Sequence, residues 1–326
     1  MSALRFAAIS NDPIAEQAAG ESLLVGSSAL SAVLAGFFAA AGANAGVLLG
    51  PISILVAGVG SGVRAFDGRL RQPGLGTKRP RGFRDEDPVP DAAYVAVPGA
   101  VAAVAVAQAY GEERALGSTV KYGVQSAQRA GAEARVEILK VVRGMGAAAF
   151  SDPAFVRPLL HVAGASEGGL LTSMDFAAVP TDIDVPAAAH PDVLGWFETP
   201  WANDSVIPPD ARASEPNIPQ MAVVAFDARG VAAAISYQRV RDGVGIDELE
   251  LEAPRAAIPV LRGVTRIAPG ERIACPVSIA LRFDGGRPVE VVASPSALRL
   301  GAEQLESPQL AIRRDHSTRL VTISRR

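Results

Sequence analysis

The hydrophobic and polar positions of the chain follow two kinds of pattern, one in each half. In the first half, apolar residues recur at helical spacing or fill whole segments, and the expected helices are 27–41, 100–110, 118–130, 132–145 and 152–163. In the second half, short apolar runs meet at turn sequences, which predicts hairpins around 227–230, 284–286 and 315–317. Helices that cover a sheet built from hairpins are typical of a layered α/β fold.

The apolar pattern is densest over residues 22–63, where no side chain is charged. A run of this length is long enough to cross a membrane. However, glycines, Asn44 and Pro51 interrupt it, and the residues before it lack the basic region of a signal peptide. We therefore expect a buried helix over 27–41, a buried extended segment over 52–60, no membrane insertion and a cytoplasmic protein.

The order of the patterns predicts one domain over 1–326 with three parts. A helix-rich half, 1–179, leads through a proline-rich connector, 180–219, to a hairpin-rich half, 220–326. Within the first half, Ser10 or Asn11 is expected to cap a helix that has Pro13 in its first turn. The polar stretch 64–91 is predicted to be a loop, and 94–97 a short strand.

Composition and charge restrict the function. Lys plus Arg is 31 and Asp plus Glu is 34, so the net charge of −3 argues against a broadly basic nucleic-acid binder. A single cysteine and three dispersed histidines offer no ligand spacing, and the sequence predicts neither a metal nor a cofactor. The apolar first half suggests surface that a homo- or hetero-oligomer would cover.

Five segments, in this order, resemble the γ-glutamyltransferase family of N-terminal-nucleophile hydrolases. They read "DPIAEQAAGESLLVGSSALSAVLAG", "GPISILVAGVGSGVRAFDGR", "YVAVPGAVAAVAVAQAYG", "GAAAFSDPAFVRPLLHVAGASEGGLLTSMDFA" and "PGERIACPVSIALRFDGGRPVEVVASPSA". The resemblance implies a four-layer αββα sandwich. It also implies acyl transfer from a γ-glutamyl amide to a threonine freed by self-cleavage, whose own α-amine serves as the base.

The chain departs from the family where that threonine would stand. The matching strand begins in "PQMAVVAFDARG", which puts Gln220, or its neighbours Pro219 and Met221, at the nucleophile position. None of them carries a hydroxyl, so none can form the acyl-enzyme. The hydroxyl residues that could act as displaced nucleophiles are Ser214, Ser205 and Thr199.

The other family sites differ as well. The serine pair expected to help form the oxyanion hole reads Ala274 and Cys275, and the final "SPGG" reads "SPSA". The resemblance implies that substrate contacts would come from Arg69 or Arg71, which would clamp a carboxylate, and from Ser294 and Ser296.

These departures lead us to expect a catalytically degenerate relative of the family. It would serve as an accessory or structural subunit of an amide-processing complex, with a small amide or carboxylate as a possible ligand. The alternative is an active amidohydrolase or γ-glutamyl-type acyl transferase that uses a displaced serine or threonine.

Overall fold

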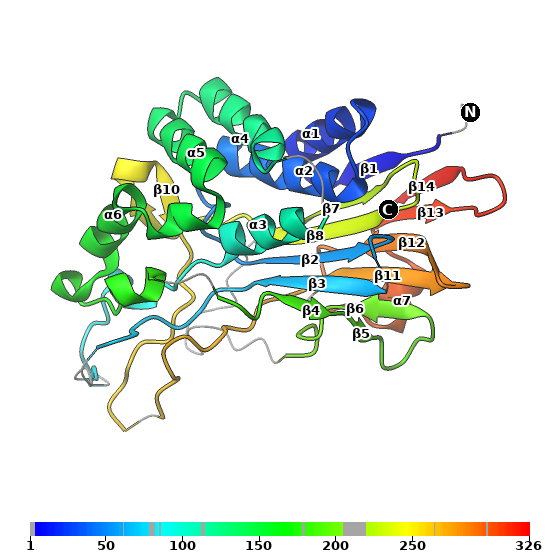
Figure 1. Ribbon diagram of the computed structural model, residues 1–326. Helices are drawn as coiled ribbons and strands as arrows, with labels where there is room; N and C mark the ends of the chain where they lie inside the picture. Colours follow the sequence, from blue (N-terminus) through cyan, green and yellow to red (C-terminus); the bar gives the residue numbers. More distant parts are fainter. Residues whose placement is uncertain are drawn as a thin grey trace.

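Two six-stranded antiparallel sheets lie face to face, with most of the helices over the outer face of the first (Figure 1). The computed structural model describes residues 4–60, 62–77, 82–84, 86–111, 115–177, 180–204, 220–263, 265–297 and 299–326. The first sheet has the order β1 (Ala7–Ser10), β7 (Gln220–Phe226), β8 (Ala232–Gln238), β2 (Ile52–Ala57), β3 (Val63–Gly68), β4 (Asp184–Pro186).

Four of the six strands of the second sheet come from the last third of the chain. Its order is β14 (Val321–Arg325), β13 (Leu310–Arg314), β12 (Arg287–Ala293), β11 (Ile279–Asp284), β6 (Trp196–Glu198), β5 (Ala188–Ala189). A separate pair, β9 (Val244–Ile246) and β10 (Leu251–Ala253), lies outside both sheets. The three predicted hairpins are present as β7–β8, β11–β12 and β13–β14.

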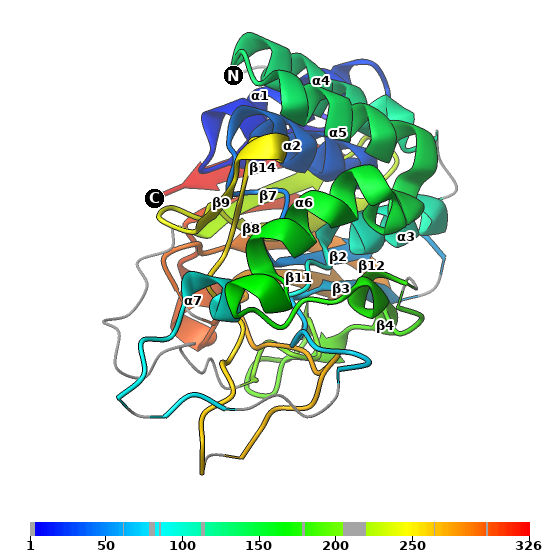
Figure 2. The same cartoon turned by 90° about the vertical axis from the view of Figure 1, so that its left-hand side faces the viewer.

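The helices form a layer over the first sheet, as Figure 2 also shows. They are α1 (Pro13–Leu24), α2 (Ala29–Ala43), α3 (Ala100–Tyr110), α4 (Gly117–Arg129), α5 (Glu133–Met145) and α6 (Pro153–Ala163). Among the described residues, the outer face of the second sheet is covered by α7 (Ala302–Glu306), whose Leu305 packs with Trp196 and Val292. Three layers are therefore complete, and one five-residue helix lies where the expected fourth layer would be.

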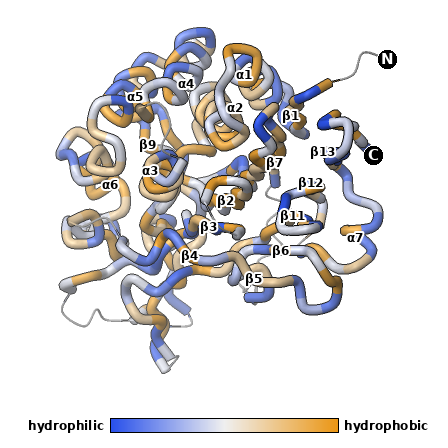
Figure 3. The backbone as a smooth tube through the Cα atoms, turned by 45° about the vertical axis from the view of Figure 1, so that its right-hand side comes forward, coloured by the Kyte–Doolittle hydropathy of each residue, from blue (hydrophilic) through white to orange (hydrophobic). Residues whose placement is uncertain are grey.

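Alternation along the strands explains why the first sheet is buried on both faces. Ile52, Ile54 and Val56 pack against the helices, whereas Leu55 and Ala57 face the second sheet. The helix α2 is buried at every residue except its last, so it needs the uncharged sequence found there. Figure 3 shows this segregation, with hydrophobic residues along α2, β2 and β7. No helix in the described part of the chain is long and apolar enough to cross a membrane.

The cap of the first helix differs from the expectation. Asp12, not Ser10 or Asn11, caps α1, because its Oδ1 accepts the amide hydrogen of Ile14 at 3.0 Å. Ser10 is the last residue of β1, and its hydroxyl donates instead to the carbonyl of Ala222 at 2.7 Å. The other carboxylate oxygen of Asp12 is also bonded, since the Tyr237 hydroxyl donates to Asp12 Oδ2 at 3.1 Å.

The prediction of a loop over 64–91 was wrong at its start. Residues up to Gly68 form β3, which pairs with β2. The following turn is fixed, because the buried carboxylate of Asp175 accepts the amide hydrogens of Gly74 and Leu75 at 3.1 and 2.9 Å. The expected strand over 94–97 is a 3-10 helix, Asp91–Tyr94, followed by isolated bridges.

Helices α2 and α4 approach so closely that glycine is required at their contact. A Cβ added to Gly42 would lie 2.0 Å from the carbonyl oxygen of Gly123. Gly20 in α1 has no atom within 4 Å of the same position.

We expect Gly42→Ala to lower the free energy of unfolding by about 3 kcal/mol, because the backbones would have to separate. Gly20→Ala, the matched control, should raise it by about 0.5–1 kcal/mol through helix propensity alone. Urea unfolding followed by circular dichroism measures both values. Equal effects of the two substitutions would contradict this account of the helix contact.

Candidate functional site

One end of the space between the two sheets is polar, while the rest is apolar. Strand pairing places Ala222, Ser236, Ser53 and Asp67 side by side across β7, β8, β2 and β3 at this end. Gln220 begins β7 next to this row. The sequence resemblance implies a nucleophile position at Gln220, and we therefore examine this polar end as the candidate site.

The side chain of Gln220 joins the two sheets. Its Nε2 donates to Ser236 Oγ at 3.1 Å and to the carbonyl of Pro276 at 2.6 Å, and its Oε1 accepts from Ser278 Oγ at 3.0 Å. Ser236 belongs to β8, whereas Pro276 and Ser278 lead into β11. Both amide hydrogens are therefore used, and Gln220 is a buried clamp between the sheets.

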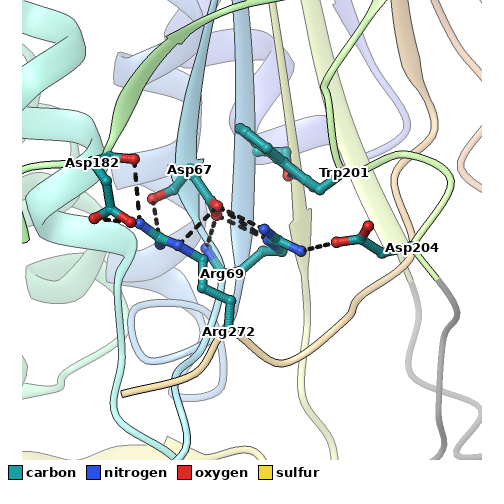
Figure 4. Close-up of polar contacts among 7 residues, drawn as sticks. Asp67, Arg69, Asp182, Trp201, Asp204 and Arg272 are labelled. Atoms are coloured by element: carbon teal, nitrogen blue, oxygen red, sulfur yellow. Dashed lines mark hydrogen bonds and ion pairs between the residues drawn. The ribbon is translucent and has the colours of Figure 1, made fainter.

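Arg69 lies at the same end, directly after β3, with its charge already neutralised (Figure 4). Its Nη2 donates to Asp67 Oδ2 at 2.9 Å, its Nη1 binds Asp204, and its guanidinium lies 5.1 Å from the centre of the Trp201 ring. Burial by itself would lower the pKa of Arg69, but the bonds to Asp67 and Asp204 outweigh it and hold the pKa above its ordinary value.

Arg272 extends this ion-pair cluster on the other side of Asp67. Its Nε lies 3.1 Å from Asp67 Oδ2, and its Nη2 lies 2.9 Å from Asp182 Oδ1. Partial burial would raise the pKa of Asp182, yet the contact with Arg272 lowers it. Asp67 is therefore shared by two guanidinium groups, and Figure 4 shows the chain of contacts from Asp182 to Asp204.

Arg71 behaves differently from Arg69. Its backbone is held by Val97, with which it exchanges hydrogen bonds of 3.0 and 2.9 Å. Its side chain is half-buried, and its Nε has no hydrogen-bond partner among the residues that the structure describes. Burial, and then the positive charge of Arg272, lowers the pKa of Arg71. A bound anion would stabilise the charged guanidinium of Arg71 against both its burial and the repulsion from Arg272.

The structure places the remaining predicted residues as follows. Ser294 lies beside the Gln220 clamp through its amide, which donates to the Ser278 carbonyl at 2.9 Å, but its hydroxyl accepts from Gln309 N. Ser296 is exposed in the same turn. Thr199 follows β6, is 1% exposed, and its hydroxyl has no partner among the described residues. Ser205 and Ser214 lie outside the described residues.

Cys275 lies close to this cluster and packs against the apolar residues between the sheets. Burial raises its pKa to about 12, an effect that the positive charge of Arg69 only partly offsets. A thiol with so high a pKa is protonated at neutral pH and is a poor nucleophile.

Reasoning from the sequence missed the acidic partners of the arginines, Asp67, Asp182 and Asp204, and the hydroxyl partners of Gln220. One signal was available, since Arg272 is the arginine of the "PGER" segment that carries the resemblance. The carboxylates of this cluster are held by arginines. The described part of the chain contains no group of three or more histidine, cysteine or acidic residues placed to hold a metal ion.

Comparison with known proteins supports the fold. No family model matches the sequence, and no curated protein matches it. Cephalosporin acylase from Bacillus halodurans superposes with a TM-score of 0.63 at 16% identity, covering 89% of this chain and 77% of that one. Two structures of LmbA2991 give TM-scores of 0.61 and 0.59, each at 16% identity over 93% of this chain and 80% of theirs.

The likeness to these structures is one of overall fold. Helicobacter pylori gamma-glutamyltranspeptidase overlaps 53% of this chain and 63% of its own at 18% identity, with a TM-score of 0.42, too partial an overlap to bear on the site. Within this fold, Gln220 is the first residue of β7 and Arg69 directly follows β3. At 16% identity the likeness concerns the fold and carries no residue roles.

We expect Gln220→Ala to lower the free energy of unfolding by about 2–4 kcal/mol, because it leaves Ser236, Ser278 and a carbonyl unpaired between the sheets. The exposed Gln17→Ala is the control and should change it by less than about 0.5 kcal/mol. Thermal and urea unfolding measure both. If Gln220→Ala lowers the free energy of unfolding no more than the control does, the hydrogen bonds of Gln220 do not stabilise the protein.

We expect Cys275 to resist thiol reagents in the native protein. With a pKa of about 12, its thiolate fraction at pH 8 is about three orders of magnitude below that of a free thiol. Because the chain has one cysteine, colour release from a chromogenic disulfide reports on this residue alone. The rate should rise steeply with pH above 8 and on unfolding. Labelling of the native protein as fast as of the unfolded chain would contradict the burial.

Proposed function

We propose that this protein is a catalytically degenerate member of the γ-glutamyltransferase-like N-terminal-nucleophile hydrolases that acts as an accessory or structural subunit. The observation that carries the proposal is the hydrogen-bonded state of Gln220. Its carboxamide cannot attack an amide, and it bonds to Ser236, Pro276 and Ser278. The position that would supply chemistry therefore stabilises the sandwich instead.

The state of Arg69 supports the same proposal. A substrate carboxylate would need this guanidinium, but Asp67 and Asp204 already bind it. A ligand would have to displace Asp204, whose side chain is 48% exposed, because Asp67 is buried and shared with Arg272. The proposed fold is the αββα sandwich with its fourth layer reduced to α7.

The alternative is an active amidohydrolase with a displaced nucleophile. Thr199 has a hydroxyl that is free of hydrogen bonds within the described residues. It is also fully buried and follows a strand instead of opening one. Neither property suits a self-processed nucleophile, whose freed amine must reach the substrate.

We expect the purified protein to remain one chain of 33.6 kDa. Intact mass spectrometry after prolonged incubation, together with labelling of new N-termini, measures this. Release of product from γ-glutamyl anilide and acyl-amide substrates should not exceed that of a heat-inactivated sample. A cut within 198–220 that exposes a serine or threonine amine would overturn the degenerate function and favour the alternative.

We expect any small carboxylate ligand to bind Arg71 and not Arg69, because the Arg71 Nε has no hydrogen-bond partner among the residues that the structure describes, whereas Asp67 and Asp204 bind Arg69. Titration calorimetry with glutamate and glutarate should show binding that Arg71→Met weakens by about tenfold or more, equivalent to about 1.4 kcal/mol. Arg255→Met is the control, since Arg255 pairs with Asp91 at the surface. Loss of binding in Arg69→Met alone would contradict the assignment to Arg71.

A further inference from the structure

The helical layer carries a continuous groove between α1 and α4. One part has a volume of about 310 Å³, and the adjoining part a volume of about 350 Å³. Glu21, Tyr122 and Gln125 line both parts, so the two form one groove. Its lining includes Ala18 and Ala39, which are buried and pack with Tyr122. These small residues leave room for a side chain from another molecule.

The rims of this groove expose large apolar side chains. Leu24 is 74% exposed, Val25 55% and Ile14 43%, and all three line the groove. Exposed aliphatic residues that border an alanine-lined hollow are typical of a surface that packs against a partner.

The charges of the groove are divided between its two walls. Glu21 lies on α1, whereas Lys121 and Arg129 lie on α4. Among the described residues, Arg129 makes no ion pair, Lys121 lies over the Tyr122 ring at 4.9 Å, and the Glu21 carboxylate accepts a hydrogen bond from Gln17. An acidic wall that faces a basic wall is complementary to a second copy of itself turned by half a revolution.

We propose that this groove is the interface of a two-fold symmetric homodimer. A two-fold axis that runs along the groove, midway between its walls, lays α1 of each copy against α4 of the other. Each Leu24 then enters the part of the groove that Lys121, Tyr122 and Gln125 of the other copy line. The same operation brings each Glu21 toward Lys121 and Arg129 of the other copy. This assembly goes beyond the proposed function and does not depend on whether the chain is catalytic.

The first test measures mass in solution over a range of concentrations by analytical ultracentrifugation of the full chain. The wild type should dimerise, and Leu24→Glu should weaken dimerisation by at least tenfold. Leu194→Glu is the matched control, because Leu194 is fully exposed and lies far along the chain, before β6. Circular dichroism verifies that both variants fold. A wild type that stays monomeric, or a dimer that Leu24→Glu leaves unchanged, would overturn the proposal.

The second test uses charge reversal. Glu21→Lys alone and the pair Lys121→Glu with Arg129→Glu should each dimerise at least tenfold more weakly than the wild type. Mixing the two variant proteins should restore dimerisation, because both contacts of the heterodimer then join opposite charges. Restoration is specific to this pairing, since a merely destabilised fold would not recover on mixing. Failure of the mixture to dimerise better than either variant alone would refute the two-fold arrangement.

Discussion

The burial of the first sheet on both faces at once is the constraint on which the rest of the structure depends. Away from the polar end, the residues of β2, β7 and β8 are apolar on both faces of the sheet, because both faces are buried. The helix α2 then lies on this sheet and beneath α4, and it has no solvent-exposed face. The uncharged sequence of residues 22–63 is thus a consequence of position within the layers. Small side chains let the layers approach, as the contact between Gly42 and Gly123 illustrates.

At the polar end of the sandwich this constraint does not hold, because polar side chains are buried there. Other groups of the same chain provide their hydrogen-bond and ion-pair partners. Gln220 satisfies hydroxyls and a carbonyl from both sheets, and Arg69 and Arg272 neutralise Asp67. Polar groups taken from water need such partners. An enzyme leaves some of them unpaired for its substrate. Among the described residues, the Arg71 Nε remains without a hydrogen-bond partner, which explains why we assign any residual ligand to this arginine.

Much of the fold was predictable because its signals are local. The helix 100–110 ends at Gly111 as expected, and the hairpin turns at Asp227 and Asp284 follow from short-range rules. The strand β3 was missed because Arg64 and Asp67 made it look like a loop, although one is paired with Asp184 and the other is buried. The arginine cluster was missed for a related reason. The ion pairs of Arg69 with Asp204 and of Arg272 with Asp67 join residues more than a hundred positions apart, and no local pattern predicts such pairs.

The order of strands in the first sheet has a consequence for synthesis. β7 and β8 lie between β1 and β2, so the platform beneath α2 is incomplete until residue 238 has left the ribosome. Until then the uncharged segment 22–63 of the nascent chain has no completed sheet to pack against. Pairings across such long loops form slowly and expose the chain to aggregation. Production of this protein therefore depends on preventing aggregation of the nascent first half until β7 and β8 have been synthesised.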